Sequence, residues 1–268
     1  MKSKLLKGTL TVVGAVVLST LSIFAADSLQ GIDSGLSNFA SVNKSGGCSA
    51  GTVPQKTESG TICIDIYEAS PSKLCPHHEL SNAIQSEQNA NTKDCSAESV
   101  GDAAPWTYVS LSQAQRLCAS AGKRLPTSEE WYRFTLGTNP DTCTIHENGV
   151  ARTGNEACVS SVGVQDAVGN VWEWVDENVV GNMIDGRALP TEGYVTSVDA
   201  NGMAITSSDV ADELYGSDYF WSKQEGVFGM IRGGFYGSNQ DAGLYTVNAS
   251  VLTSFATQGV GFRCVKDL

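Results

Sequence analysis

Basic residues are scarce in this chain. Its 268 residues include 17 Lys and Arg against 29 Asp and Glu, which gives a formal net charge of −12. Such a surface repels nucleic acid and anionic membranes and attracts divalent cations, so we expect neither nucleic acid nor a membrane surface as a partner. Charged residues make up only 17% of the chain and glycine accounts for 28 residues, a composition typical of a folded extracytoplasmic domain.

Long apolar runs are also rare, since only one occurs, from Gly8 to Ala26. Three lysines precede this run and small residues close it, which is the pattern of an export signal cleaved after Ala25 or Ala26. An uncleaved membrane anchor is the alternative, because the run approaches the roughly 20 residues that span a bilayer. Either way we expect the remainder outside the cytoplasm: secreted, periplasmic or at the cell surface. Without the three lysines, 14 basic residues stand against 29 acidic ones, a net charge of −15.

The sequence divides into three parts. We expect residues 1–26 to be the signal peptide, residues 27–47 a flexible linker and residues 48–268 a single domain. The stretch 27–47 is rich in Ser, Asn and Gly and has too few apolar residues to form a core. The remainder has the length of one domain and shows no internal repeat.

Eight cysteines in an exported chain indicate disulfides rather than metal thiolates. Eight cysteines allow 105 pairings, so spacing alone does not fix the connectivity. Closeness along the chain nevertheless favours three local couples and leaves one long-range pair. The favoured pairs are Cys48 with Cys63, Cys75 with Cys95, Cys143 with Cys158, and Cys118 with Cys264.

Two helix starts stand out. In the first, Ser110 is the expected N-cap and Gln113 completes a capping box, while Gly122 supplies the left-handed stop. In the second, Thr127 is the N-cap and Glu130 follows three residues later. The sequence therefore predicts two helices that begin directly after Ser110 and Thr127.

The other signals indicate short strands and coil. "TICIDIYEA", from Thr61 to Ala69, alternates apolar and polar residues as a strand does. After Gly137 the chain becomes rich in Gly, Asn and Asp, with short apolar stretches at "VWEWV" and "GVFGMIRGG". Long ordered coil in a compact domain needs clamps such as disulfides or bound ions. Two helices, short strands and clamped loops predict an α+β domain.

Four stretches occur in order: "CIDIYEAS", "AQRLCASAGKRLPTSEEWYRF", "DAVGNVWEW" and "IRGGFYG…GVGFRCV". Together they resemble the formylglycine-generating enzyme, or sulfatase-modifying factor, family over nearly everything after Cys63. The resemblance implies a variant of the C-type-lectin fold, with two helices, small antiparallel sheets and much ordered coil. It also implies a disulfide between Cys118 on the first helix and Cys264 of the terminal "GFRC".

The resemblance implies a calcium ion at "DAVGNVWEW". The matching ligands are the side chains of Asp166 and Glu173 and the backbone carbonyls of Gly169 and Val171. Calcium accepts such mixed shells of carboxylate and carbonyl oxygens. The alternative is that both acids are ordinary loop-capping residues.

Catalytic cysteines are missing from the expected position. The family's enzymes bind copper with two cysteines just after the "RGG" motif, and alignment from Arg232 places Ser238 and Gly243 there. Neither residue supplies the soft thiolate that copper(I) selects, and no cysteine lies between Cys158 and Cys264. We therefore expect no copper and no formylglycine-generating oxidase activity. An enzyme of the family with an altered active site is the alternative.

The chain has only three histidines, and none falls in a recognisable catalytic pattern. A metal site at His77, His78 and Glu79 is conceivable, but a solvated loop is the favoured interpretation of these residues.

The segment 236–258 is rich in tyrosine, serine and asparagine, a mixture that recognition surfaces favour. An ordinary polar loop is the alternative. The segment also resembles, in position and composition, the variable tail of retroelement variable proteins of this fold. We therefore expect a secreted or surface-tethered, non-catalytic module that binds an extracellular protein or glycan; a structural envelope protein is a further alternative. The expected binding residues are Tyr236, Ser238, Asn239, Gln240, Asp241, Tyr245, Asn248 and Phe255.

Overall fold

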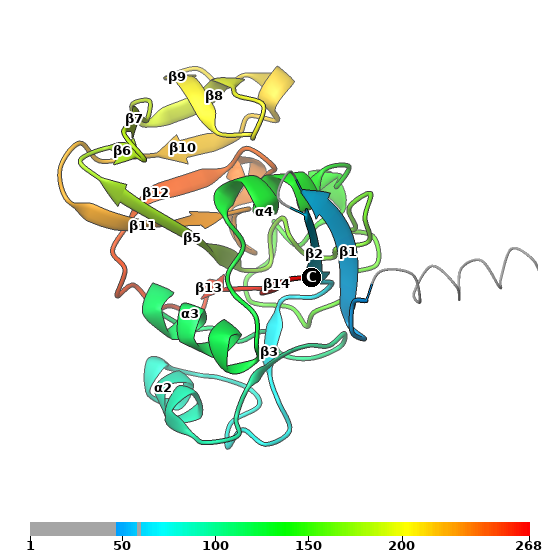
Figure 1. Ribbon diagram of the computed structural model, residues 1–268. Helices are drawn as coiled ribbons and strands as arrows, with labels where there is room; N and C mark the ends of the chain where they lie inside the picture. The colour runs from blue at the N-terminus through cyan, green and yellow to red at the C-terminus, as the bar shows by residue number, and fades with distance from the viewer. Residues whose placement is uncertain (1–46, 58–59) are drawn as a thin grey trace, which may run out of the picture. The chain divides into compact units, whose positions relative to one another are not determined.

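The computed structural model describes residues 47–57 and 60–268 (Figure 1). The expected signal peptide and nearly all of the expected linker lie outside these residues. Residues 48–268 form one compact unit. Within the part of the chain that is described, no helix has both the length and the apolar character needed to cross a membrane.

A nine-stranded sheet is the largest element of this unit. The strand order is β7-β6-β5-β11-β12-β10-β8-β9, with β13 paired to β5. Most neighbours are antiparallel, but β10 with β12 and β13 with β5 are parallel. The strands are β5 (Trp172–Val180), β6 (Met183–Ile184), β7 (Arg187–Ala188), β8 (Gly193–Val198), β9 (Ala204–Ser208), β10 (Tyr219–Trp221), β11 (Val227–Arg232), β12 (Val247–Val251) and β13 (Val260–Gly261).

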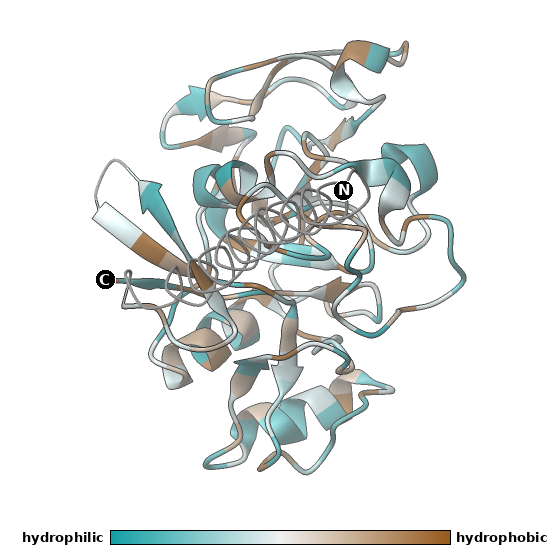
Figure 2. Cartoon of the chain, turned by 90° about the vertical axis from the view of Figure 1, so that its right-hand side faces the viewer, coloured by the Kyte–Doolittle hydropathy of each residue, from teal (hydrophilic) through white to brown (hydrophobic). Residues whose placement is uncertain are grey.

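Two smaller sheets complete the strands. β1 (Thr52–Thr57), β2 (Gly60–Asp65) and β14 (Val265–Asp267) form one, and β3 (Ala69–Pro71) pairs with β4 (Ala97–Ser99) in the other. Figure 2 shows the second half of β2 in the brown of apolar residues, and this central strand is buried from Ile62 onward. The strand expected over 61–69 ends earlier than predicted: β2 stops at Asp65, and β3 begins only at Ala69.

Both expected helices are confirmed. α3 (Leu111–Ser120) and α4 (Ser128–Thr135) each begin with a complete capping box, formed by Ser110 with Gln113 and by Thr127 with Glu130. α3 ends before Gly122, which has the expected left-handed conformation with a φ of 69°.

A further helix, α2 (Ala83–Asn91), lies in the loop closed by Cys75 and Cys95. Its buried side chains are polar. Ser86 accepts a hydrogen bond from the Trp106 indole nitrogen at 3.0 Å, and Asn89 bonds the backbone of His77 through both ends of its amide. Because polar contacts hold this helix, the apolar spacing of the sequence did not indicate it.

Hydrophobic cores lie on both faces of the large sheet. Trp131 and Phe134 of α4 belong to one core, together with Phe220 of β10. Leu117 of α3 belongs to the other, with Trp174 of β5. α3 and α4 therefore contribute to different cores, and the sheet has no fully polar face.

Four disulfides join the couples that the sequence favours: Cys48–Cys63, Cys75–Cys95, Cys118–Cys264 and Cys143–Cys158. Between α4 and β5 the chain is coil, as expected, interrupted by the short 3-10 helix η1 (Pro140–Thr142). The other two 3-10 helices are η2 (Glu213–Tyr215), between β9 and β10, and η3 (Asn239–Asp241), between β11 and β12.

Candidate functional site

The loop that follows β11 begins with two obligatory glycines. Gly233 and Gly234 have φ values of 90° and 84°. A Cβ on Gly233 would lie 2.3 Å from the carbonyl oxygen of Ala167, and one on Gly234 would lie 2.5 Å from the Cβ of Ala242. The "GG" sequence thus allows the loop to turn back closely against the coil before β5 and against its own far end.

Arg232, the last residue of β11, anchors this loop from inside. Its guanidinium donates to the carbonyl and hydroxyl oxygens of Ser128 at 3.1 and 2.7 Å, and to the carbonyls of Gly202 and Leu244 at 3.1 and 3.0 Å. It also lies 4.9 Å from the ring of Trp131. Burial lowers the pKa of Arg232 to about 10. The side chain therefore joins α4, the β8–β9 turn and the loop.

Of the two positions that the resemblance aligns with copper ligands, Ser238 is used in a turn and position 243 has no room for a side chain. The Ser238 hydroxyl accepts a hydrogen bond from the backbone nitrogen of Phe235 at 3.0 Å and so closes a turn. A Cβ on Gly243 would lie 2.0 Å from Oδ1 of Asp218 and 2.4 Å from Oδ2. The carboxylate of Asp218 thus occupies the space that a side chain at position 243 would need.

Asp218 is itself nearly inaccessible, with 3% of its surface exposed. It accepts a hydrogen bond from the backbone nitrogen of Tyr245 at 2.6 Å. Burial raises the pKa of Asp218 to about 7, although this hydrogen bond and Arg232 oppose the shift. The ring of Tyr245 lies 5.8 Å from Tyr132 and 5.5 Å from Tyr215, so an aromatic cluster covers the acid.

A hollow of about 490 Å³ lies beside this loop. Asn239, at the start of η3, meets the His146 ring with its amide oxygen 3.1 Å from Nδ1. The lining is mostly polar and carries more acid than base. Its residues include Asp141, His146, Glu213, Ser217, Gln240 and Ala242.

The expected binding residues do not form one face. Tyr236 and Ser238 to Asp241 belong to the loop at the hollow, whereas Tyr245 lies in the tyrosine cluster. Asn248 lies on β12 opposite Trp221, and Phe255 lies in the turn that follows. Among the residues the structure describes, neither Asn248 nor Phe255 shares a hydrogen bond or ring contact with the loop. Asp218 and Trp221 were missed, because no motif marks them in the sequence.

A buried charge cluster lies at the start of β5. Glu68, Asp166, Glu173 and Arg263 are each at most 1% exposed. Arg263 donates to both carboxylate oxygens of Glu173 at 2.6 to 2.9 Å, and the Trp131 indole donates to Glu173 Oε2 at 2.8 Å. Burial raises the pKa of Glu68 well above its usual value, and Asp166 and Glu173 raise it further. The cluster thus contains three acids for one guanidinium.

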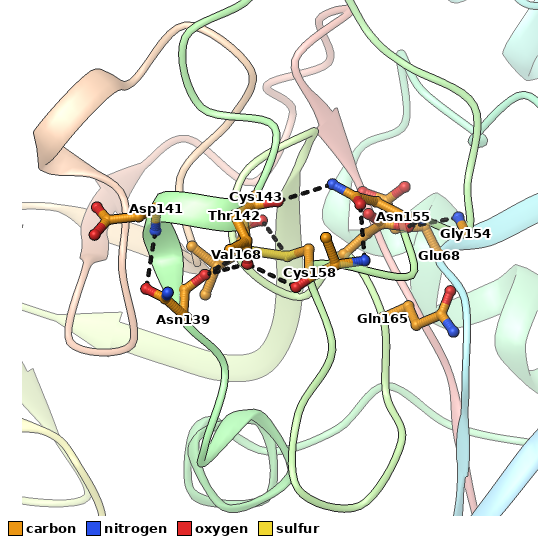
Figure 3. Close-up of a disulfide and its surroundings, with 12 residues drawn as sticks. Glu68, Asn139, Asp141, Thr142, Cys143, Gly154, Asn155, Cys158, Gln165 and Val168 are labelled. Carbon is orange, nitrogen blue, oxygen red and sulfur yellow. Dashed lines mark hydrogen bonds between the residues drawn. A yellow bond between two sulfur atoms is a disulfide. The ribbon is translucent and has the colours of Figure 1, made fainter.

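A disulfide-clamped loop holds Asp166. The backbone nitrogens of Gly154 and Asn155 donate to its Oδ2 at 2.6 and 3.1 Å. Figure 3 shows Gly154 and Asn155 at one end of the bridge between Cys143 and Cys158. This local disulfide therefore orders the amides that bind the acid.

The expected calcium ligands carry the negative charge that the ion needs, but one of them, Glu173, already uses its oxygens in other hydrogen bonds. Asp166 and Glu173 belong to the same acidic cluster, and its surplus of carboxylates favours a cation. Arg263 and Trp131, however, already use both oxygens of Glu173. Within residues 47–57 and 60–268, no group of three or more His, Cys, Asp or Glu side chains is arranged to hold a metal ion. Calcium at Asp166, Gly169, Val171 and Glu173 stays a prediction, and so does metal binding at His77, where Nε2 meets Gln88 Oε1 at 2.7 Å.

Comparison with known proteins gives four similarities. Residues 140–268 match the sulfatase-modifying factor enzyme 1-like domain. The chain is 26% identical over 122 residues to the inactive C-alpha-formylglycine-generating enzyme 2 of Bos taurus, covering 36% of this chain and 40% of that protein. The Major Tropism Determinant M1 Variant is 18% identical with a TM-score of 0.49, over 83% of this chain and 54% of that one. PvdO from Pseudomonas aeruginosa is 14% identical with a TM-score of 0.43, over 81% and 90%. The chain therefore spans less than two thirds of the first two relatives.

Proposed function

We propose a non-catalytic binding function for this chain, whose residues 140–268 match the sulfatase-modifying factor enzyme 1-like domain. The α+β fold of the formylglycine-generating enzyme type, with its C-type-lectin-like arrangement of helices, small antiparallel sheets and ordered coil, is the one expected from the sequence. On this scaffold, the loop after β11 and its hollow take the place of the family's catalytic pocket.

One observation carries the proposal: the carboxylate of Asp218 fills the room beside Gly243. At the two aligned positions, the hydroxyl of Ser238 and the carboxylate beside Gly243 offer hard oxygen ligands, which copper(I) disfavours. All eight cysteines of the chain are used in disulfides. The relative from Bos taurus, which is named inactive, is consistent with a catalytically silent member of the family.

The loop has the composition of a recognition surface, since Asn239 and Gln240 are exposed and Gln240 lines a polar hollow. Amide and hydroxyl groups of this kind bind proteins or glycans through adaptable hydrogen bonds. Four disulfides suit a chain that works in an oxidising compartment outside the cytoplasm. An extracellular protein or glycan is therefore the proposed ligand class.

A ligand screen with the full chain tests the function. We expect a glycan array or a pull-down from extracellular extracts to yield a ligand, and Gln240→Ala to weaken its binding. Gln224→Ala is the matched control, because Gln224 is also exposed but lies outside the loop. If the chain instead converts a cysteine-containing sulfatase-motif peptide to an aldehyde, the enzymatic alternative replaces this proposal.

A thermal melt tests the predicted calcium ion. A ligand that binds only the native state stabilises it by about 2.7 kcal/mol at one hundred times its dissociation constant. We therefore expect a chelator to lower the Tm by several degrees and added calcium, but not magnesium, to restore it. A midpoint that does not respond to the chelator counts against the site.

A further inference from the structure

An aromatic ladder crosses one face of the large sheet; we use this name for Tyr194, Tyr219, Trp221 and Trp172. Successive ring centroids along the ladder are 5.0, 4.6 and 5.7 Å apart. The rings meet edge to face or tilted, at 83°, 49° and 82°. Four aromatic side chains from β8, β10 and β5 therefore form one continuous row.

Strand register places the ladder on a single face. Tyr219 pairs directly with Tyr194, and Trp221 follows two residues later, so its side chain points the same way. Phe220, between them, points to the opposite face and is fully buried in the core. Trp221 pairs with Asn248 of β12, which adds an amide beside the rings. Figure 1 shows β8, β10 and β12 side by side at this end of the sheet.

The ladder is partly open to solvent. Tyr194, Tyr219 and Trp221 are half-buried, whereas Trp174, on the same face nearer α3, is fully buried. Tyrosine and tryptophan at such positions present an apolar ring and a polar edge together. The Asn248 amide oxygen accepts from the nitrogen and hydroxyl of Ser250. Among the described residues, its amide nitrogen has no hydrogen-bond partner and is available as a donor.

Negative charge lies beside Tyr219 of the ladder. The Tyr219 hydroxyl donates to Glu192 Oε1 at 3.4 Å. Burial, and then the charges of Glu192 and Asp209 among others, raise the pKa of Tyr219. Anionic ligands, including nucleic acids and acidic polysaccharides, are repelled from such a surface. An extended peptide would add to a sheet edge, whereas the ladder lies on a face.

We propose that the aromatic ladder is a binding site for a neutral glycan. The ring faces of Trp221 and Tyr219 stack on the apolar C–H faces of successive sugar units. Asn248 donates to sugar hydroxyls and Glu192 accepts from them. The proposal rests on the proposed function only in taking the chain to be a binding module, since the ladder is separate from the loop at Gln240.

Oligosaccharide titration of the full chain tests this site. The probes are two neutral hexamers, cellohexaose and N-acetylchitohexaose, and an acidic one, hexagalacturonic acid, with calorimetry and tryptophan fluorescence as readouts. We expect at least one neutral hexamer to bind and the acidic one not to bind. Trp221→Ala should weaken binding by about tenfold through loss of stacking, and Trp221→Phe should retain most of it.

Tyr67→Ala is the matched control, because it removes an equally half-buried ring that belongs neither to the ladder nor to the loop after β11. It should leave oligosaccharide affinity unchanged, and thermal melts of all variants should establish that each is folded. Equal affinity for the acidic hexamer, or no loss in Trp221→Ala, overturns the glycan site. So does a concentration-dependent dimer that Trp221→Ala dissociates, because a second copy would then cover the ladder. If no hexamer binds while the screen yields a ligand that depends on Gln240, the inference fails and the proposed function stands.

Discussion

Two arginines, Arg232 and Arg263, are buried in this domain in different ways. Both have no exposed surface. Burial lowers the pKa of Arg263, but the bidentate carboxylate of Glu173, together with Glu68 and Asp166, outweighs burial and raises it. Arg232 meets carbonyl and hydroxyl oxygens but hydrogen-bonds no carboxylate, and one of its atoms, Nε, has no partner among the described residues.

The difference separates a fixed part of the domain from an adaptable one. Arg263 precedes Cys264 and ties the C-terminal segment to β5 through Glu173. Because both side chains are buried, neither can be replaced without leaving the other charge unpaired. Arg232 precedes "GG" and holds the loop through the backbone carbonyl of Leu244, which is present whatever side chains the loop carries. The loop can therefore change its exposed residues while the rest of the domain retains its contacts.

The largest effect should come from the covalent bond beside Arg263. Replacing both Cys118 and Cys264 by Ser opens a loop with a sequence separation of 146. Loop-closure entropy predicts a loss of about 5 kcal/mol in unfolding free energy, measured by urea denaturation. The pair Cys143→Ser with Cys158→Ser, with a separation of 15, should cost about 3 kcal/mol. Equal losses would show that chain entropy does not explain the stabilisation.

Removing each arginine compares the two regions directly. Arg263→Met leaves Glu173 buried without its partner and should lower the unfolding free energy by about 3–5 kcal/mol. Arg232→Met deprives no carboxylate of a hydrogen-bonded partner and should cost less. Arg152→Met on the exposed surface is the control and should change stability little. If Arg232→Met is as costly as Arg263→Met, the ion pair is not what distinguishes the two sites.

The pH dependence of the unfolding free energy tests the buried acid Asp218, whose pKa is raised to about 7. Its pKa rises from 3.8 to about 7 on folding, so the folded state holds a proton that the unfolded state has lost. This group therefore lowers stability as pH rises from about 4 to about 7, by roughly 1.4 kcal/mol per unit. Asp218→Asn should remove that slope between pH 5 and 7, a change of about 2 kcal/mol in unfolding free energy. An unchanged slope would assign the titration to another buried acid, such as Glu68.

Local signals in the sequence predicted the local structure. Thr127 and Glu130 lie within one helical turn of each other, so their capping box depends on nothing distant. α2 lacks an apolar stripe and is held by Trp106, which no local pattern indicates. Three of the four disulfides could also be predicted from local spacing, because they join cysteines at most 20 residues apart.

Sites assembled from several strands could not be predicted in this way. Tyr194 and Tyr219 become neighbours only through the register of β8 with β10. Glu68, between β2 and β3, comes near Glu173 of β5 because Arg263 donates both to Glu173 and to the carbonyl of Asp65 at the end of β2. The expected face at 236–258 was one continuous segment in sequence, and β12 passes through it and turns Asn248 toward Trp221. The tertiary contacts, not the composition, decide which polar residues share a surface.

The smallest expected effect concerns position 243, where the carboxylate of Asp218 takes the space of a side chain. Gly243→Ala should lower the unfolding free energy by about 1–3 kcal/mol, because its methyl group collides with the carboxylate of Asp218. Gly149→Ala is the control, since a Cβ there meets nothing within 4 Å. In an Asp218→Ala background the same methyl group should cost less, and the double-mutant cycle measures that coupling. Additive losses would mean that the carboxylate does not occupy the space. Strong coupling would mean that a cysteine introduced at position 243 alone has no room, so regaining the thiol pair requires removing Asp218 as well.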